Sequence, residues 1–251
     1  MRVLFAHGFE GTPDGGKSTY MAEVLGWEVT SPVMSAKGWN IGQETQVLLD
    51  LIDANEYDIV AGSSMGGLAA ANASALRPDA DFSLLLIAPA FGLADLWRTG
   101  MPAAQMDAWK TTGSIAYHHH GFGHHIELPW DFMEAADKLS WPTLNHPTVI
   151  LHGTDDDVVP IENSRKVPGV VALLEIEDGH RMQLAMPHFA AAAALLMLFA
   201  ARKLRLHPAL KNPTVMVVVD RIDLDSQISS TFYAASAANL VKAESRKDLQ
   251  E

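Results

Sequence analysis

Short apolar runs alternate with longer helical stretches along most of the chain. The apolar runs predict buried strands at residues 2–6, 57–61, 83–90, 147–151 and 171–176. Between them lie stretches with helical character, such as residues 67–76, which end before Pro78. Strands that alternate with helices are typical of an α/β protein, in which helices flank a mostly parallel sheet.

Two segments depart from this simple alternation. Residues 91–146 are longer than a crossover helix requires, so we expect an insertion within one main domain that spans residues 1–203. Within that domain, residues 190–201 predict an apolar helix that packs on the sheet. Residues 204–251 follow as an extension.

The extension contains a predicted strand at residues 213–220 and a predicted helix at residues 231–249. A strand as apolar as this one should be buried. We therefore expect the extension to pack on the domain or on a partner subunit, which would make the protein a homo-oligomer.

Composition narrows the class of protein. The 251 residues include no cysteine, which excludes disulfides, thiol catalysis and cysteine-ligated zinc and suits a reducing compartment. The net charge of −12 disfavours nucleic acids and acidic lipid surfaces as partners. No apolar run reaches the length of a membrane span, and the first residues are too quickly polar for a signal peptide. We expect a cytoplasmic protein with no nucleic-acid or membrane partner.

The sequence Gly62-Ser63-Ser64-Met65-Gly66 joins a predicted strand to a predicted helix. A G-x-S-x-G turn at such a junction strains its central serine, here Ser64, and holds the hydroxyl clear of the sheet. Glycines are needed at both flanks because a Cβ would collide with the neighbouring strand or helix. Taken alone, the motif also fits a tight turn with a helix-capping serine.

A serine nucleophile needs a base, and the base needs an acid that orients it. In hydrolases with this turn, the acid and then the base follow the serine along the chain. One later strand ends in three consecutive aspartates, Asp155, Asp156 and Asp157, and the next ends at His180. The residues alone leave the choice of aspartate open, because such a loop also fits a turn with helix-capping carboxylates.

The first predicted strand runs directly into His7-Gly8-Phe9. Acyl transfer requires backbone N–H donors aimed at the developing oxyanion. One donor is expected at the residue after the nucleophile, Met65, and the other in the loop after an early strand, where Phe9 is the candidate. The alternative is that His7-Gly8 is a simple strand-ending turn.

Over residues 2–203 these motifs resemble the α/β-hydrolase superfamily, and most of all its small YqiA-like bacterial serine esterases, which lack two leading strands. The resemblance implies the α/β-hydrolase fold with a lid insertion and a Ser64, His180 and Asp156 triad. It selects Asp156 by register with the neighbouring His152-Gly153 and Val159-Pro160. It also implies cleavage of a small-molecule carboxylic ester without a cofactor. Thioester and carbon–carbon bond hydrolysis on the same triad stay open.

In related hydrolases, an insertion at the position of residues 91–146 forms a lid over the nucleophile. Its aromatic and methionine side chains would make an apolar acyl or aryl pocket, or would only pack the lid onto the body. An insertion of this size forms a few helices or a hairpin, so we expect a compact cavity and short to medium acyl chains. The residues expected to line it are His7, Gly8, Trp97, Trp109 and Trp130.

A second motif, Gly11–Ser18, satisfies the G-x-x-x-x-G-K-[ST] pattern of phosphate-binding loops and would indicate a nucleotide-binding protein. In such loops the first glycine closes the strand, whereas Gly11 follows Ala6 by five residues. Pro13 lacks an amide donor, and the nearest candidate for a Mg²⁺-binding acid, Asp220, lies at the far end of the chain. We expect a glycine-rich entry into the first helix instead.

The segment His118–His125 contains five histidines, and imidazole clusters bind Zn²⁺, Ni²⁺ or Cu²⁺. Glu127 is the nearest carboxylate, and none accompanies the histidines at a regular helical spacing. We therefore predict no functional metal site here.

Overall fold

The computed structural model describes residues 1–211 and 213–216. It divides into two compact units, the first comprising residues 1–186 and the second beginning at Pro187. The predicted helix at 231–249 lies outside the described residues, as does the predicted strand at 213–220 except for residues 213–216, which form no helix or strand. The domain limits 1–203 and 204–251 stay predictions.

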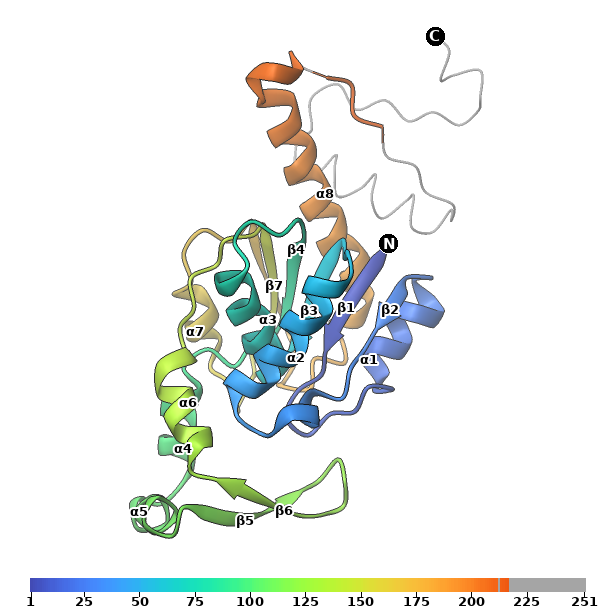
Figure 1. The fold of residues 1–251 in the computed structure, drawn as a ribbon. Coiled ribbons are helices and arrows are strands. Elements are labelled where there is room, and N and C mark those ends of the chain that lie inside the picture. The colour runs from blue at the N-terminus through green and yellow to red at the C-terminus, as the bar shows by residue number, and fades with distance from the viewer. Residues whose placement is uncertain (212, 217–251) are drawn as a thin grey trace. The chain divides into compact units, whose positions relative to one another are not determined.

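A parallel sheet of six strands forms the centre of the first unit (Figure 1). Its order is β2-β1-β3-β4-β7-β8. The bounds are Arg2–Ala6 for β1, Glu28–Thr30 for β2, Ile59–Ser63 for β3, Ser83–Ile87 for β4, Thr148–Gly153 for β7 and Ala172–Ile176 for β8. The five predicted strands are confirmed, and β2 is an additional, partly exposed edge strand.

The strand order reverses beside β1, because the chain passes from β1 to β2 on one side and then returns to β3 on the other. At such a point the two loops that leave neighbouring strands diverge and open a crevice at their carboxyl ends. The loop after β1 carries Phe9, and the turn after β3 carries Ser64. The topology therefore brings the two predicted halves of the site to one place.

Helices flank this sheet. They are α1, Gly16–Thr19, which continues into a π-helical turn at Tyr20–Val24, then α2, Ile41–Ala54, α3, Met65–Leu76, and α7, Ile161–Arg165. The small side chains of α3 are buried, which lets this helix approach the strands closely. Helices α2 and α3 lie against each other (Figure 1). Asn40 caps the start of α2 in a reciprocal capping box with Gln43.

The predicted insertion forms both helices and a hairpin. It comprises α4, Leu93–Gly100, α5, Ala103–Thr112, the antiparallel strands β5, Ser114–His119, and β6, His124–Pro129, and α6, Asp131–Leu139. These elements gather beyond the end of the sheet that lies away from the N-terminus (Figure 1). The N-terminus begins β1, so the insertion lies toward the carboxyl ends of the strands.

The second unit contains α8, Phe189–Leu206, and a short 3-10 helix, Pro208–Leu210. The helix predicted at residues 190–201 is thus confirmed as an element. No helix in the described part of the chain combines the length and apolar character needed to cross a bilayer.

Candidate functional site

Ser64 occupies a sharp turn between β3 and α3, with φ 55° and ψ −121°. Positive φ is unfavourable for a residue with a Cβ, so the fold imposes this strain. A Cβ at Gly62 would overlap the Gly66 carbonyl, and one at Gly66 would overlap the carbonyls of Ala6 and His7. The requirement for glycine at both flanks, predicted from the motif, is confirmed.

Ser64, His180 and Asp156 come together as a hydrogen-bonded relay. The Nε2 atom of His180 lies 2.9 Å from Ser64 Oγ. On the other side of the ring, Nδ1 lies 2.8 Å from Asp156 Oδ2 and 3.0 Å from Oδ1. A carboxylate at Nδ1 holds the ring in the tautomer whose Nε2 can accept a proton from the serine.

The side chain of Asp156 is fully buried and accepts two backbone hydrogen bonds. Its Oδ1 lies 3.0 Å from the Val158 nitrogen and 2.8 Å from the Val159 nitrogen. Burial opposes ionisation, but the hydrogen bonds from His152, His180 and the Val159 N–H outweigh it and hold the pKa of Asp156 well below its ordinary value. The carboxyl is therefore an anion at neutral pH.

Asp155 and Asp157, the two other aspartates of this loop, are exposed, and neither side chain contacts His180. Of the three consecutive aspartates, Asp156 is thus the one whose carboxylate contacts His180.

A second histidine, His152, touches the same carboxylate and was not expected from the sequence. It is fully buried at the end of β7, and its Nε2 lies 2.9 Å from the Val159 carbonyl and 3.2 Å from Asp156 Oδ2. Its Nδ1 lies 2.7 Å from Ser164 Oγ. Because a carbonyl only accepts, Nε2 carries the proton and Nδ1 accepts from the serine hydroxyl. His152 is therefore a second side-chain donor to the Asp156 carboxylate.

The loop predicted to bind the oxyanion, Gly8–Gly11, follows β1 and lies directly beside the serine; we call it the oxyanion loop. A Cβ at Gly8 would lie 3.2 Å from the Ser64 Cβ. The backbone N–H groups of Phe9 and Met65 donate no hydrogen bond to any described residue. Two free amides at a serine on a helix N-terminus are what a developing oxyanion requires.

The orientation of the Phe9 amide follows from the residue before it. The Gly8 carbonyl accepts from the Gly11 N–H at 2.8 Å and from His7 Nδ1 at 2.9 Å. This carbonyl and the Phe9 N–H belong to one planar peptide group, so holding the oxygen also aims the hydrogen the opposite way. His7 was expected to line the pocket, but its contacts are with the loop backbone.

His7 is almost fully buried, and its protonation follows from its partners. Its Nε2 accepts from the Met34 N–H at 3.3 Å, so Nδ1 carries the single proton. Burial lowers the pKa of His7, its hydrogen bond to the Gly8 carbonyl acts in the opposite sense, and nearby His119 lowers it further. His7 is therefore neutral at physiological pH.

An aromatic cluster surrounds the side chain of Phe9. Its ring lies edge-on to Trp39 at 5.7 Å and to Trp97 at 6.1 Å, measured between ring centroids. Tyr117 and Phe132 also contact it, at 5.4 and 5.7 Å. The insertion therefore contributes an apolar wall beside the oxyanion loop. Trp39, which lies outside the insertion, was not among the expected residues.

The tryptophans of the insertion differ in position. Trp97 and Trp130 are partly exposed. Trp109 is fully buried, and its Nε1–H donates to the Leu128 carbonyl at 3.0 Å. The expectation that Trp109 lines a pocket is therefore wrong, because its indole is enclosed within the insertion and holds α5 against β6.

The groups that a phosphate-binding loop would use are engaged elsewhere. Lys17 Nζ donates to the Arg181 carbonyl at 2.8 Å, next to His180. Burial lowers the pKa of Lys17, and Asp178 opposes this shift. Ser18 Oγ lies 2.7 Å from the Pro13 carbonyl and 2.8 Å from the Gly15 carbonyl. The Gly11–Ser18 segment thus connects α1 to the loop that carries the histidine of the triad.

The histidine segment lies on the β5–β6 hairpin. His118 pairs across the hairpin with His125, with ring centroids 5.0 Å apart. In the part of the chain that the structure describes, no group of three or more histidines and carboxylates is placed to hold a metal ion. His118 and His125 are exposed, whereas His119 is fully buried and faces the oxyanion loop.

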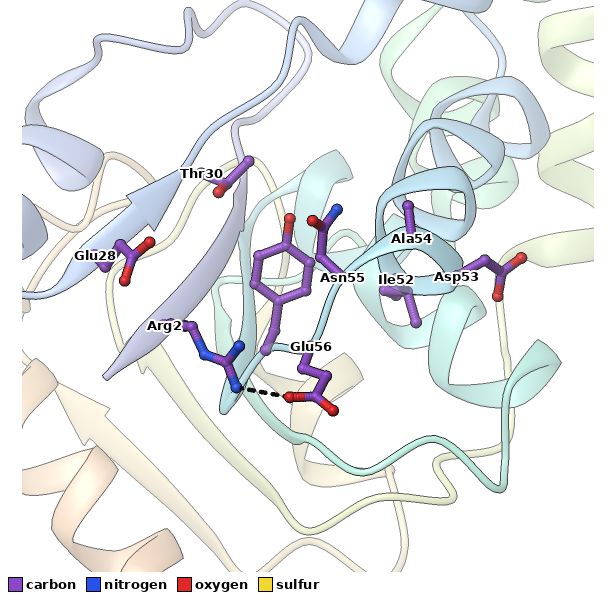
Figure 2. Close-up of a pocket in the computed structure, with 9 residues that line it drawn as sticks. Arg2, Glu28, Thr30, Ile52, Asp53, Ala54, Asn55 and Glu56 are labelled. Carbon is purple, nitrogen blue, oxygen red and sulfur yellow. Dashed lines mark hydrogen bonds and ion pairs between the residues drawn. The ribbon is translucent and has the colours of Figure 1, made fainter.

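A surface pocket of about 530 Å³ lies at the other end of the sheet (Figure 2). It is bordered by the start of β1 and by the residues between α2 and β3. Figure 2 shows the ion pair between Arg2 and Glu56, whose nitrogen and oxygen are 3.2 Å apart. Because this pocket adjoins the amino ends of the strands, it is remote from Ser64 and takes no part in the triad.

Comparisons with known protein families cover different parts of the chain. The model of the uncharacterised protein family UPF0227 matches residues 2–197. The model of the SWI2/SNF2 ATPase family matches residues 191–251. The endonuclease subunit of the type I restriction enzyme HindI from Haemophilus influenzae is 51% identical over 49 residues, which are 20% of this chain and 4% of that protein. The ATPase match lies outside Gly11–Ser18 and does not bear on that loop.

Solved structures support the fold. Mouse alpha/beta hydrolase domain-containing protein 10 aligns with a TM-score of 0.59 and 21% identity over 82% of this chain and 90% of that one. Est1E from Butyrivibrio proteoclasticus aligns with a TM-score of 0.58 and 17% identity over 79% and 86%. Paleococcus ferrophilus monoacylglycerol lipase aligns with a TM-score of 0.55 and 19% identity over 78% of this chain and 94% of that one. At these identities the similarity establishes the α/β-hydrolase fold alone.

Proposed function

Since the chain belongs to the UPF0227 family and has the α/β-hydrolase fold, we propose that it is a serine hydrolase that cleaves carboxylic esters. The observation that carries the proposal is the continuous relay from Ser64 Oγ through His180 to Asp156. Fold alone does not determine the reaction, whereas a relay of this order and geometry is the arrangement that activates a serine as a nucleophile.

In the proposed reaction, Ser64 Oγ attacks the acyl carbonyl while His180 Nε2 accepts the hydroxyl proton. The negative charge that develops on the carbonyl oxygen is bound by the N–H groups of Phe9 and Met65. His180 then donates its proton to the departing alcohol, which leaves an acyl group on Ser64. Water, deprotonated by His180, attacks this ester, and the acid leaves with the serine restored.

The substrate is proposed to carry a short to medium acyl chain. The aromatic wall around Phe9 offers an apolar surface close to the nucleophile, and the insertion that supplies it is compact. Each methylene that fits should contribute up to about 0.8 kcal/mol of binding, and one that does not fit should introduce strain. Est1E of the same fold has been described with bound ferulic acid, so aryl esters belong in the test.

The first experiment asks which serine reacts. A fluorophosphonate should add one covalent group to the protein, located on Ser64, and Ser64→Ala should abolish both labelling and turnover of activated esters. The matched control is Ser63→Ala, one residue away and without contact to His180. Labelling of Ser63 or Ser18 would overturn the assignment.

The second experiment addresses the acyl group. A panel of para-nitrophenyl esters from acetate to dodecanoate, with the matching thioesters, measures kcat/KM against chain length. We expect a rise over the first carbons and then a fall. A steady rise to the longest ester would overturn the compact-pocket proposal, and faster turnover of thioesters would favour the thioesterase alternative.

A nucleotide-binding protein is the alternative from another class. Lys17 and Ser18, which would contact phosphate and Mg²⁺, are both hydrogen-bonded to backbone carbonyls. This observation favours the hydrolase.

A further inference from the structure

The β5–β6 hairpin of the insertion meets the oxyanion loop at two residues. His119 Nε2 lies 2.7 Å from the Phe9 carbonyl. The Tyr117 hydroxyl donates to the Glu10 carboxylate at 2.8 Å. A Cβ at Gly121, in the hairpin turn, would overlap the Glu10 carbonyl. The hairpin therefore contacts the loop backbone too closely to be a loose cover.

The hydrogen bonds of His119 indicate which of its ring nitrogens donates. Its Nδ1 accepts from the Phe122 N–H at 3.1 Å, so the proton is on Nε2 and is donated to the Phe9 carbonyl. The imidazole is fully buried, and the Phe122 ring stacks on it with centroids 4.2 Å apart. A buried ring with both nitrogens bonded to backbone is held in a fixed position.

We propose that His119 is a positioning residue for the oxyanion hole. It holds the Phe9–Glu10 peptide, while His7 and the Gly11 N–H hold the Gly8–Phe9 peptide. The two peptides flank the Phe9 α-carbon, so together they set the direction of the Phe9 N–H. The inference rests on the proposed function and adds to it that the insertion orients a catalytic amide.

Tyr117 provides a second point of attachment. Burial, together with its hydrogen bond to Glu10, raises the pKa of Tyr117 well above its ordinary value, so the hydroxyl stays a neutral donor. The exposed His118 on the same strand makes no contact with the loop and serves as a matched control.

Loss of the His119 donor would leave the Phe9 carbonyl without its hydrogen bond, whereas the Phe122 N–H would keep the His119 carbonyl as an acceptor at 3.2 Å. The Phe9 peptide could then rotate away from the serine. Removal of a whole oxyanion donor costs about 10²–10³ in kcat, which is the upper limit for a misplaced one. We expect His119→Phe to lower kcat by about tenfold to a hundredfold, with KM changed by less than about threefold.

The experiment compares His119→Phe, which keeps a ring without the donor, with His119→Gln, which keeps an N–H donor of similar reach. The control is His118→Phe. For each variant we would measure kcat and KM on a para-nitrophenyl ester, the rate of Ser64 phosphonylation, the affinity for a trifluoromethyl ketone that forms a tetrahedral oxyanion, and urea unfolding. The ketone affinity should fall in parallel with kcat for His119→Phe and recover in His119→Gln.

A folded His119→Phe variant with the kcat and ketone affinity of His118→Phe would overturn the inference. If His119→Phe does not fold, the pair His119→Gln and His119→Met, similar in volume and different only in the donor, decides by the same comparison. A wild-type protein that is labelled on Ser64 but hydrolyses no ester would refute the ester substrate, and the phosphonylation rates would then decide the role of His119. Absence of labelling in the wild type would overturn both.

Discussion

Replacement of Asp156 by asparagine tests the relay at its acid, the residue that the sequence motifs alone could not distinguish from its two neighbouring aspartates. Asp156 Oδ1 accepts from the N–H groups of Val158 and Val159, whereas Oδ2 lies 2.8 Å from His180 Nδ1. In Asp156→Asn we expect the amide oxygen to stay with the two backbone donors at Oδ1, because they outnumber the single donor at Oδ2, His152 Nε2, which lies 3.2 Å away and also contacts the Val159 carbonyl. The amide nitrogen then occupies the Oδ2 position.

From that position the amide donates to His180 Nδ1, which can accept only if the imidazole proton moves to Nε2. A protonated Nε2 faces Ser64 Oγ at 2.9 Å and cannot take the hydroxyl proton. The expected loss in kcat is about 10⁴-fold, or about 5 kcal/mol of transition-state stabilisation, since both the tautomer and the support for the imidazolium are lost.

The matched controls are Asp155→Asn and Asp157→Asn, which make the same chemical change at exposed positions of the same loop. They should keep kcat/KM within about threefold of the wild type, because neither carboxylate contacts the triad. Urea unfolding would establish that each variant is folded at the assay temperature. A folded Asp156→Asn within tenfold of the wild type would refute the tautomer argument, and a greater loss in Asp155→Asn would show that the register is wrong.

Three further predictions concern other parts of the molecule. Calorimetry with ATP or GTP and Mg²⁺ should show no binding at micromolar concentrations, because Lys17 is hydrogen-bonded to the Arg181 carbonyl. Saturable binding that is lost in Lys17→Ala would support the nucleotide-binding alternative. Gly66→Ala should lower the free energy of unfolding in urea by about 1–3 kcal/mol or more through overlap with the carbonyls of Ala6 and His7, whereas Gly100→Ala, with open space around it, should be neutral or stabilising. Burial lowers the pKa of His7 and of His146, so below about pH 6.5 the unfolded chain binds more protons than the folded protein. The free energy of unfolding should therefore decrease as the pH falls below about 6.5 and level off below the lowered pKa values. A free energy of unfolding, measured in urea, that does not change between about pH 7.5 and about pH 5 would contradict this.

The strands predicted from the hydrophobic pattern are present in the structure, but some of them begin or end at other residues than predicted, for physical reasons. The third strand ends at Ser63 rather than Ala61, because Gly62 and Ser63 pair with Leu86 and Ile87 of β4. A pattern that counts apolar residues stops at the first glycine, whereas a ladder of backbone hydrogen bonds continues through it. Strand β2 was missed because three residues at an edge, only partly buried, leave too short a pattern.

For the site, local motifs were enough to name Ser64 and His180, because each follows a strand end, whereas the choice of Asp156 among three aspartates needed the resemblance to α/β-hydrolases. The motifs were not enough for the contacts that hold those residues in place. His119 and Phe9 are separated by 110 positions, and Tyr117 and Glu10 by 107. Such pairs depend on how the insertion folds back toward β1, and the spacing of apolar residues within one segment carries no information about that. The same limit explains why Trp109 was assigned to a pocket wall and is instead enclosed.

The buried histidines around the relay share one arrangement that separates them from the proposed base. In His7, His119 and His152, one ring nitrogen donates to a backbone carbonyl and the other accepts from an N–H or a hydroxyl. A ring held in this way has no nitrogen left for a reacting proton, so its contribution is to fix backbone or carboxylate. The side chain of His180 is 20% exposed, and its Nε2 faces the serine hydroxyl. This difference supports the proposal that His180 transfers the proton, while the other three histidines hold the backbone and carboxylate groups around it.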